Sequence, residues 1–450
     1  MEYHELSVAE AAKQIRSGEI SPVELAGALL LRAEELDPTL HAWVSLDRKS
    51  VLTQAERSLK QLQDGSPTGI LHGVPIGLKD IFYTAGTKTT ACSSRYADFV
   101  PNYDATCVSR LKDAGAIMMG KLVTTPYAAS DPSPTLNPWD TKRTPGGSSS
   151  GSAVAVSTGM CPAALGSQTV GSTLRPAAYA GIVGLKPTFG MVSLHGVIPL
   201  GRTLDTVGVL TRTVRDAELL LMAMSGYDPR DPVSAFTSFQ FAERLSYQDF
   251  SPRIGLVEEF FFQHSDRETK NHITAVADKL SDAGAQITRN LLSETELEEL
   301  HHATTTTFEV DVAAEHGPHY LADASLYPPQ IAKIIERGLQ TPAHAYANAQ
   351  RTRVILRQRL RECFESVDVL LSPSTPGQAP LSATGTTGPP IFQGPWTSSG
   401  IPAISIPSGL DSSNLPIGTQ LAGPMFGERK LITVAGWCEW TLDQQLVIQT

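Results

Sequence analysis

Three short segments of this 450-residue chain combine residue types that nucleophilic catalysis requires. In the first, Gly73–Asp80, a lysine at position 79 ends a run of apolar residues. Burial would lower the pKa of this amine, and a neutral amine can act as a base. The residues alone leave another interpretation open, in which Lys79 extends its amine to solvent or pairs with Asp80.

The second and third segments combine glycines with serines. In Thr144–Ser152, two adjacent glycines precede three serines, and glycine permits backbone angles that other residues resist. In Gly166–Pro176, Ser172 follows a glycine, and the N–H groups before it could hold an oxyanion. Taken singly, each segment is equally compatible with an ordinary turn or loop.

Taken together, the three segments resemble the Gly/Ser-rich signature of the amidase signature family. The similar stretches are Thr144–Ala155 and Gly166–Thr188. Further similar motifs lie at Gly73–Asp80, Thr84–Thr90, Asn137–Asp140, Pro373–Pro376, Trp396–Pro407 and Pro416–Gly423. The resemblance covers residues 60–225 and 365–440 well and residues 226–345 poorly. It implies the family's α/β fold, with a large mixed central β-sheet surrounded by helices.

The resemblance also implies a Ser-cisSer-Lys triad. Its lysine falls on Lys79, its bridging serine with a cis peptide bond on Ser148, and its nucleophile on Ser172. In this mechanism, Lys79 takes a proton from Ser148, Ser148 takes one from Ser172, and Ser172 forms an acyl-enzyme. The main-chain N–H groups expected to hold the oxyanion are those of Thr169, Val170, Gly171 and Ser172.

Some residues depart from the common family pattern. Gln168 stands where many members have Asp, while Val170 and Ser150 stand where many have Gly. These replacements resemble one subgroup of the family, and the branched Val170 is expected to narrow the acyl side. Arg175 has two interpretations: it binds a substrate carboxylate, as malonamidase-like members suggest, or it pairs with Asp or main-chain carbonyls.

The substrate is predicted only by class. Tyr127, Phe392, Trp396 and Ile401 are candidate pocket residues, and their apolar character favours a neutral acyl or aryl group. We therefore expect a hydrolase of non-peptide C–N bonds that cleaves a small-molecule amide or carbamate (urethane), with esters as side substrates. Arg175 favours small acids instead, so aliphatic amides, aryl amides, carbamates and malonamates all stay open.

Other functions fit parts of the sequence. Gly147–Gly151 matches G-x-S-x-G, the elbow of α/β-hydrolases, with Ser149 as nucleophile, but no strand precedes it. A glutaminase component of a tRNA-dependent amidotransferase, working with partner subunits, is a further alternative. A binding or scaffold subunit is disfavoured because all three triad residues are present. Gly115–Lys121 has the spacing of a P-loop, but Leu122 stands where a P-loop needs Ser or Thr to hold magnesium. We therefore expect no nucleotide binding there.

The composition narrows the partners. The net charge of −10 argues against nucleic acid, and no apolar run reaches the ~20 residues of a membrane helix. The acidic N-terminus lacks signal-peptide character, so we expect a cytoplasmic protein. The five cysteines lack CxxC spacing and are expected to be buried thiols. No metal and no cofactor are predicted.

The elements that must position these residues follow from local patterns. Residues 1–60 are expected to form helices, with capping boxes at Ser7 and Ser21, and could pack on the body or form a homodimer face. Residues 61–225 form the signature core of alternating strands and helices, and residues 346–450 its C-terminal part. Residues 226–345 are predicted to be a variable, mostly helical region that covers the substrate.

Overall fold

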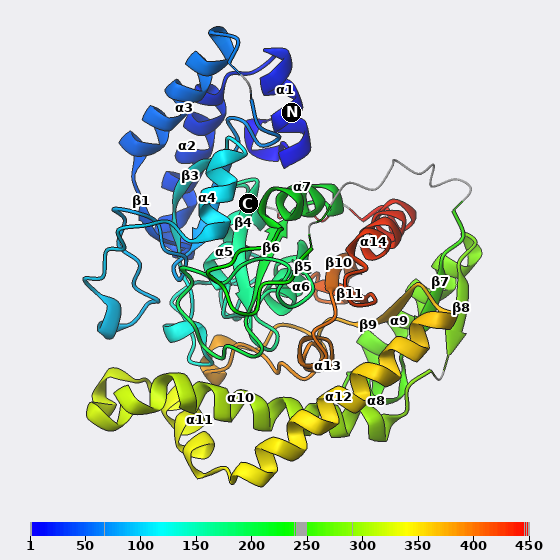
Figure 1. Cartoon of the computed structure of the whole chain (residues 1–450). Coiled ribbons are helices and arrows are strands. Elements are labelled where there is room, and N and C mark those ends of the chain that lie inside the picture. Colours follow the sequence, from blue (N-terminus) through cyan, green and yellow to red (C-terminus); the bar gives the residue numbers. More distant parts are fainter. Residues whose placement is uncertain are drawn as a thin grey trace.

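A computed structural model describes residues 2–66, 68–237, 239, 250–289, 291–444, 446 and 448. Its described part contains one mixed sheet of eleven strands in the order β1-β3-β2-β4-β6-β5-β10-β11-β9-β7-β8, with helices on both faces (Figure 1). The predicted fold class is therefore confirmed. The strands are β1 (Trp43–Leu46), β2 (Pro75–Lys79), β3 (Ile117–Leu122), β4 (Ala163–Gln168), β5 (Val183–Lys186), β6 (Thr206–Thr211), β7 (Arg253–Leu256), β8 (Gln286–Arg289), β9 (Val369–Pro373), β10 (Ala403–Leu410) and β11 (Pro416–Ala422).

Strand β2 lies between β3 and β4 and runs parallel to both. Every residue of β2 and β4 is buried, which explains why their sequences read as short apolar runs without alternation. Because parallel neighbours end at the same edge of a sheet, the residues that close β2 and β4 lie next to each other. This edge holds Lys79, at the end of β2, and the turn that follows β4.

The N-terminal helices α1 (Val8–Ser17), α2 (Pro22–Leu40) and α3 (Arg48–Gln63) lie beyond one end of the sheet, where Figure 1 shows them in blue. Ser7 and Ser21 cap α1 and α2 in full capping boxes, as predicted. Helix α1 contacts α7 (Val214–Met224) of the body. The N-terminal helical segment thus packs on the body of its own chain through α1.

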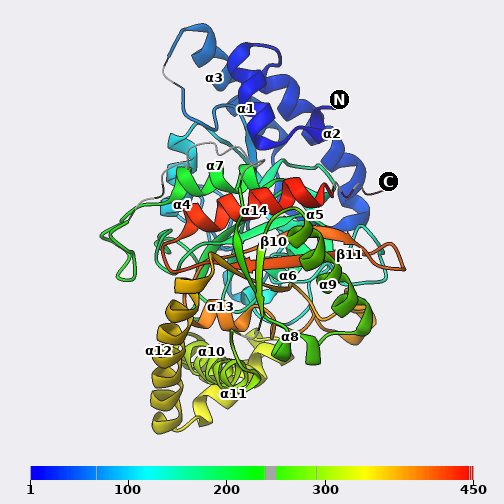
Figure 2. The same ribbon diagram turned by 90° about the vertical axis from the view of Figure 1, so that its right-hand side faces the viewer.

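Helices from the two halves of the chain cover the sheet. Figure 2 shows α7 and α14 lying side by side across it, and the two are in contact. Helix α5 begins within the serine-rich run, directly after Ser149, so this run is structured and is not a linker. Besides α7, the helices of the core are α4 (Thr106–Asp113), α5 (Ser150–Ser157), α6 (Leu174–Ala180), α13 (Gly394–Ser398) and α14 (Glu428–Leu442).

The interval 226–345 contributes strands β7 and β8 and several helices. Helix α10 packs against α11 and α12, and these three helices lie at the bottom of Figure 1; α10 also contacts α13 of the core. Residues 238, 240–249 and 290 of this interval lie outside the described residues. The helices are α8 (Glu259–Gln263), α9 (Arg267–Asp282), α10 (Glu294–Ala322), α11 (Pro329–Gln340) and, beyond the interval, α12 (Ala343–Ser366).

Two sequence expectations have plain structural outcomes. Four cysteines are buried as free thiols, whereas Cys92 is only half-buried, in a turn where it adopts a φ of 46°. In the described residues no helix combines the length and the apolar character needed to cross a bilayer.

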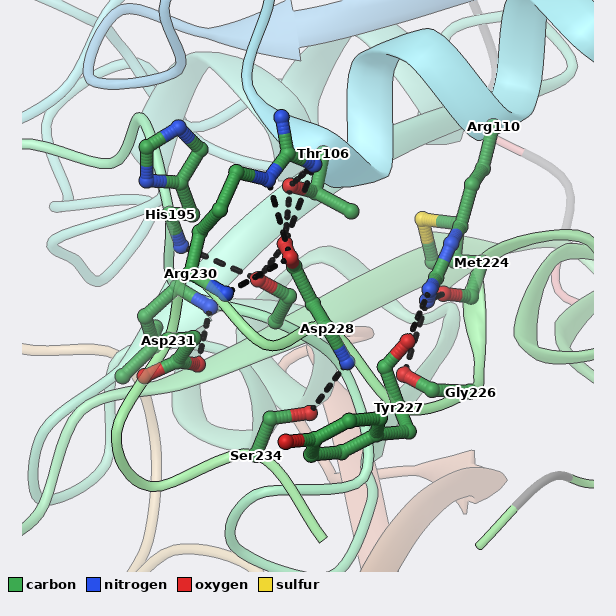
Figure 3. A network of polar contacts seen from close by, with 12 residues as sticks. Thr106, Arg110, His195, Met224, Gly226, Tyr227, Asp228, Arg230, Asp231 and Ser234 are labelled. Carbon is green, nitrogen blue, oxygen red and sulfur yellow. Dashed lines mark hydrogen bonds and ion pairs between the residues drawn. The ribbon is translucent and has the colours of Figure 1, made fainter. Parts of the chain in front are cut away.

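A polar network fixes the segment that leaves α7 (Figure 3). The carboxylate of Asp228 is 2% exposed and accepts hydrogen bonds from Thr106 Oγ1 (2.5 Å), Ser193 Oγ (2.8 Å) and Arg230 Nε (2.9 Å). Beside it, the guanidinium of Arg110 donates to the carbonyls of residues 224, 226 and 227. The network ties this segment to the start of α4.

We predict that Asp228→Ala lowers the free energy of unfolding by about 2 to 3 kcal/mol, because it leaves buried donors without an acceptor. Urea unfolding followed by circular dichroism measures the loss. Asp98→Ala is the control, because Asp98 is paired with Lys88 but has a 95% exposed side chain, and its loss should leave the unfolding midpoint unchanged. Equal midpoints for the two variants would contradict the prediction.

Candidate active site

Lys79 is fully buried at the end of β2, and hydroxyl groups surround its amine. Its Nζ lies 2.7 Å from Ser148 Oγ and 2.8 Å from Ser167 Oγ. The neighbouring Asp80 does not pair with Lys79. Its carboxylate accepts from Thr90 N (3.0 Å) and lies 3.8 Å from the amine of Lys121. The solvent-reaching and Asp80-paired interpretations of Lys79 are therefore both wrong.

Burial determines the protonation of this amine. It lowers the pKa of Lys79 to about 7, against the weaker opposing effects of Asp205 and Cys92. At neutral pH a large fraction of Lys79 is uncharged, with a lone pair that can accept a proton from a neighbouring hydroxyl.

Ser148 is held by the loop that precedes α5. The peptide bond between Gly147 and Ser148 is cis, as the resemblance implies. Thr125 N donates to the carbonyl of Ser148 (3.1 Å), and Arg175 Nη2 donates to the carbonyl of Gly147 (2.7 Å). These bonds place the hydroxyl of Ser148 against Lys79.

Ser172 lies in the turn between β4 and α6. Ser149 N donates to the carbonyl of Ser172 (3.2 Å), so this turn is joined to the loop of Ser148. Within the described residues, the hydroxyl of Ser172 makes no hydrogen bond, and the N–H groups of residues 169–172 donate to no other group. These four predicted donors are available to an oxyanion. Hydrogen bonds between catalytic groups often tighten only when substrate binds.

Gln168 supports the same turn from behind. Its Oε1 accepts from the N–H groups of Thr173 (3.0 Å) and Leu174 (3.1 Å) at the start of α6. Its Nε2 donates to Thr397 Oγ1 (2.9 Å), and that hydroxyl donates to the carbonyl of Val170 (2.8 Å). An amide thus caps α6 and binds Thr397 at the same time, which accounts structurally for Gln at this position.

A cavity of about 320 Å³ opens at Ser172. One wall comes from the signature core and from residues 386–390, and the other comes from α10 and α11, in the interval 226–345. The wall is mainly apolar or neutral, and it includes Ala128, Val170, Leu200, Thr304, Phe308, Ile334, Pro389 and Pro390.

The charged residues that line this cavity have partners. Arg175 is buried, and its terminal nitrogens donate to Gly388 O (2.7 Å), Gly147 O and Thr387 Oγ1 (3.1 Å). Arg337 pairs with Glu309 at 2.5 Å. Of the two interpretations of Arg175, the geometry favours the structural one, in which this side chain holds the loop of Ser148.

The other predicted pocket residues lie behind the cavity wall. Phe392, Trp396 and Ile401 are at most 2% exposed and belong to one buried cluster, in which Phe261 lies against both aromatic rings. Tyr127 is buried as well, and its ring stacks on Tyr327 with centroids 4.7 Å apart. These four side chains are not part of the cavity lining, although Ala128, next to Tyr127, is.

Two residues of the site were not singled out from the sequence. Ser167 contacts Lys79 only because β2 and β4 are parallel neighbours, which no local pattern reveals. Asp205 contacts the turn of Ser172 from a distant part of the chain. Ser149, the alternative nucleophile, is buried, follows no strand, and exchanges hydrogen bonds with the main chain of Ser167, so the α/β-hydrolase alternative has no support.

Comparison with known proteins now decides the family. The sequence profile described as Amidase matches residues 24–432. The chain belongs to the amidase signature family. Among curated relatives of this amidase-signature chain, the glutamyl-tRNA(Gln) amidotransferase A subunit of Halothermothrix orenii is 34% identical, covering 100% of this chain and 99% of the relative. The corresponding protein of Geobacter sp. (strain M21) is 35% identical, with 97% of each chain covered.

Solved structures of the family agree with the fold. A peptide amidase from Stenotrophomonas maltophilia is 29% identical, with a TM-score of 0.85 and coverage of 100% of this chain and 99% of that one. A structure described as an amidase is 28% identical, with a TM-score of 0.86 and coverage of 97% and 99%. The amidase-signature chain therefore has both amidotransferase components and amidases among its similar proteins.

We predict that the rate at which a fluorophosphonate labels Ser172 rises with pH through about 7, the pKa to which burial lowers Lys79, because only the uncharged amine can accept the proton. Lys79→Met should reduce the rate by about a hundredfold or more and abolish this pH dependence. Intact-protein and peptide mass spectrometry measure the rate and the labelled position.

Lys186→Met provides the matched control. Burial also lowers the pKa of Lys186 to about 7, but within the part of the chain that the structure describes its amine donates only to the carbonyls of Pro187 and Ile401. This variant should keep the wild-type pH dependence of labelling. Loss of the pH dependence in Lys186→Met, with the wild-type dependence retained in Lys79→Met, would assign the titration to Lys186 and contradict the prediction.

Proposed function

We propose that this amidase-signature chain hydrolyses an amide or carbamate bond of a small, uncharged molecule through an acyl-enzyme on Ser172. The observation that carries the proposal is the buried Lys79, 2.7 Å from Ser148 and with a pKa of about 7, beside the cavity at Ser172. A neutral base, a hydroxyl relay and free main-chain donors are the parts that acyl transfer requires.

The proposed reaction begins when Ser172 attacks the acyl carbon. Its proton passes to Ser148, whose own proton passes to Lys79. The negative charge that develops on the acyl oxygen is stabilised by N–H groups of residues 169–172, each worth about 3 kcal/mol of barrier. Ser148 then returns a proton to the departing amine, and water attacks the acyl-enzyme to release the acid and free Ser172.

The cavity favours an uncharged substrate. Among the described residues, the arginines and the glutamate that line it already hold hydrogen-bonding partners, and most other lining residues are apolar or neutral. A substrate carboxylate would have to compete with the carbonyls and the hydroxyl that already hold Arg175, and a substrate ammonium would meet a glutamate already paired with Arg337, so either charge would lose hydration for little gain. The attacked carbon is alike in amides and carbamates, so the shape of the cavity selects between them.

A second candidate function is the glutaminase step of an amidotransferase. It is favoured by the curated relatives, which are amidotransferase A subunits at 34% and 35% identity over nearly the whole chain. The cavity argues against it, because glutamine carries both a carboxylate and an ammonium group. Of the charged lining residues, Arg175 is engaged with the main chain and Glu309 with Arg337.

We expect the isolated chain to hydrolyse neutral 4-nitroanilides or aryl carbamates at least about tenfold faster, in kcat/KM, than the matched malonamate or glutamine. Absorbance at the nitroaniline or phenol band and ammonia release measure these rates. Ser172→Ala and Lys79→Met should each lose nearly all activity. Lys186→Met serves as the control that retains it.

Two outcomes would overturn this assignment. Preference for malonamate would show that a charged group is accommodated beside Arg175. Ammonia release from glutamine only after amidotransferase partner subunits are added would favour the second candidate.

A further inference from the structure

Asp205 places a buried carboxylate directly behind the oxyanion turn. Its Oδ1 accepts from Thr169 Oγ1 at 2.6 Å, and its Oδ2 accepts from the N–H groups of Leu200 (2.9 Å) and Gly201 (3.1 Å). No lysine or arginine lies within ion-pair distance of this carboxylate in the described part of the chain. Asp205 is thus a fixed and unpaired acid inside the site.

This carboxylate and the amine of Lys79 are held by the same strand end. Lys79 contacts Ser167, the second-last residue of β4, and Asp205 contacts Thr169, the residue directly after β4. Residues two apart on an extended chain are about 7 Å apart. In a buried setting, opposite charges held by neighbouring residues of one strand end interact appreciably. Asp205 is also the strongest of the charges that oppose the effect of burial on the pKa of Lys79.

We propose that Asp205 is the counter-charge that stabilises Lys79 when this amine takes the proton from Ser148. The proposal rests on the proton relay of the proposed function and adds a positioning residue to it. In the Ser-His-Asp triad, an aspartate contacts the imidazolium that forms. Here the carboxylate acts across Thr169 and Ser167 and does not touch the amine.

The surroundings keep Asp205 charged at neutral pH. Burial raises its pKa to about 6, while the hydrogen bonds from Thr169 and from the main chain of residues 200 and 201 oppose this rise. The other titratable groups around the pair are Cys92 near Lys79, Asp311 on α10, which raises the pKa of Asp205 further, and Arg202. Above pH 6 the carboxylate is therefore mostly ionised while Lys79 titrates.

Asp205→Asn tests the charge with little change of shape. The amide oxygen can accept from the N–H groups of Leu200 and Gly201, and the NH₂ group can donate to the hydroxyl of Thr169. We expect the midpoint of the pH dependence of fluorophosphonate labelling at Ser172 to fall by about one unit, because Lys79 loses the charge that favours its protonated form. The plateau rate should fall about threefold, because the base is weaker.

Asp216→Asn is the matched control. Asp216 is another buried aspartate whose pKa burial raises to about 6, but it accepts from Ala9 N, between α1 and α7. This variant should keep the wild-type midpoint. Thr169→Val is the second variant, because it removes the hydroxyl that stabilises the charge of Asp205, and it should move the midpoint in the same direction by less.

The outcomes separate this inference from the proposed function. A wild-type midpoint in Asp205→Asn, or in Thr169→Val should the first variant fail to fold, would overturn the role of Asp205 alone. Labelling at Ser172 with the shifted midpoint, combined with no hydrolysis of any amide or carbamate, would overturn the substrate class and leave this inference standing. No labelling of Ser172 in the wild type would overturn both.

Discussion

The chemistry of this site depends on removing an amine from water without giving it a carboxylate in direct contact. Three lysines of the chain, Lys79, Lys121 and Lys186, are almost completely buried, and burial lowers the pKa of each, to about 7, 8 and 7. What distinguishes them is the partner. Lys186 faces carbonyls, which can only accept, and Lys121 faces a carbonyl, hydroxyls and Asp80. The amine of Lys79 differs from that of Lys186 because it meets the hydroxyl of Ser148, and from that of Lys121 because, among the described residues, it has no carboxylate within ion-pair distance.

The sheet topology produces this arrangement. Parallel β2 and β4 bring Lys79 and Ser167 to one edge, and the loop of Ser148 must then approach the same edge closely. Gly151, in the first turn of α5, permits that approach, because a Cβ atom there would lie 2.3 Å from the carbonyl oxygen of Ala42 and 2.5 Å from Val123 N. The small residues of the signature therefore serve close packing as well as chemistry.

The sequence predicts what short segments determine. Capping boxes place α1 and α2, apolar runs place β2 to β5, and the signature motifs indicate Lys79, Ser148 and Ser172. It does not predict contacts set by long-range topology. Ser167 and Asp205 act through neighbours that are distant in the chain.

Pocket residues are the weakest part of that prediction, for a physical reason. Large apolar side chains such as Phe392 and Trp396 are expected at a binding site, but the same apolar character favours the core, and both are buried there. The side chains that line the cavity from α10 and α11 include threonines, His301, Gln330 and Arg337, which resemble any polar helix surface in sequence. The type of a residue alone therefore does not tell whether an apolar side chain lies in the core or at the cavity, or whether a polar one lines the cavity or faces solvent.

The helical wall of the cavity is tied to the core that carries Lys79, Ser148 and Ser172. Helix α11 begins after Pro328 and has no side-chain cap of its own. Asp131 of the core supplies one, accepting from the N–H groups of Gln330 (2.9 Å) and Ile331 (3.0 Å), and it directly follows Ser130 of the cavity lining. A carboxylate at a helix N-terminus is favoured by both its hydrogen bonds and the helix dipole. Further bonds join the core to α10, from Thr203 N to Asp311 (3.0 Å) and from Arg202 Nε to Glu315 (2.8 Å). The cap on α11 and these bonds together hold the helical wall of the cavity in place over Ser172.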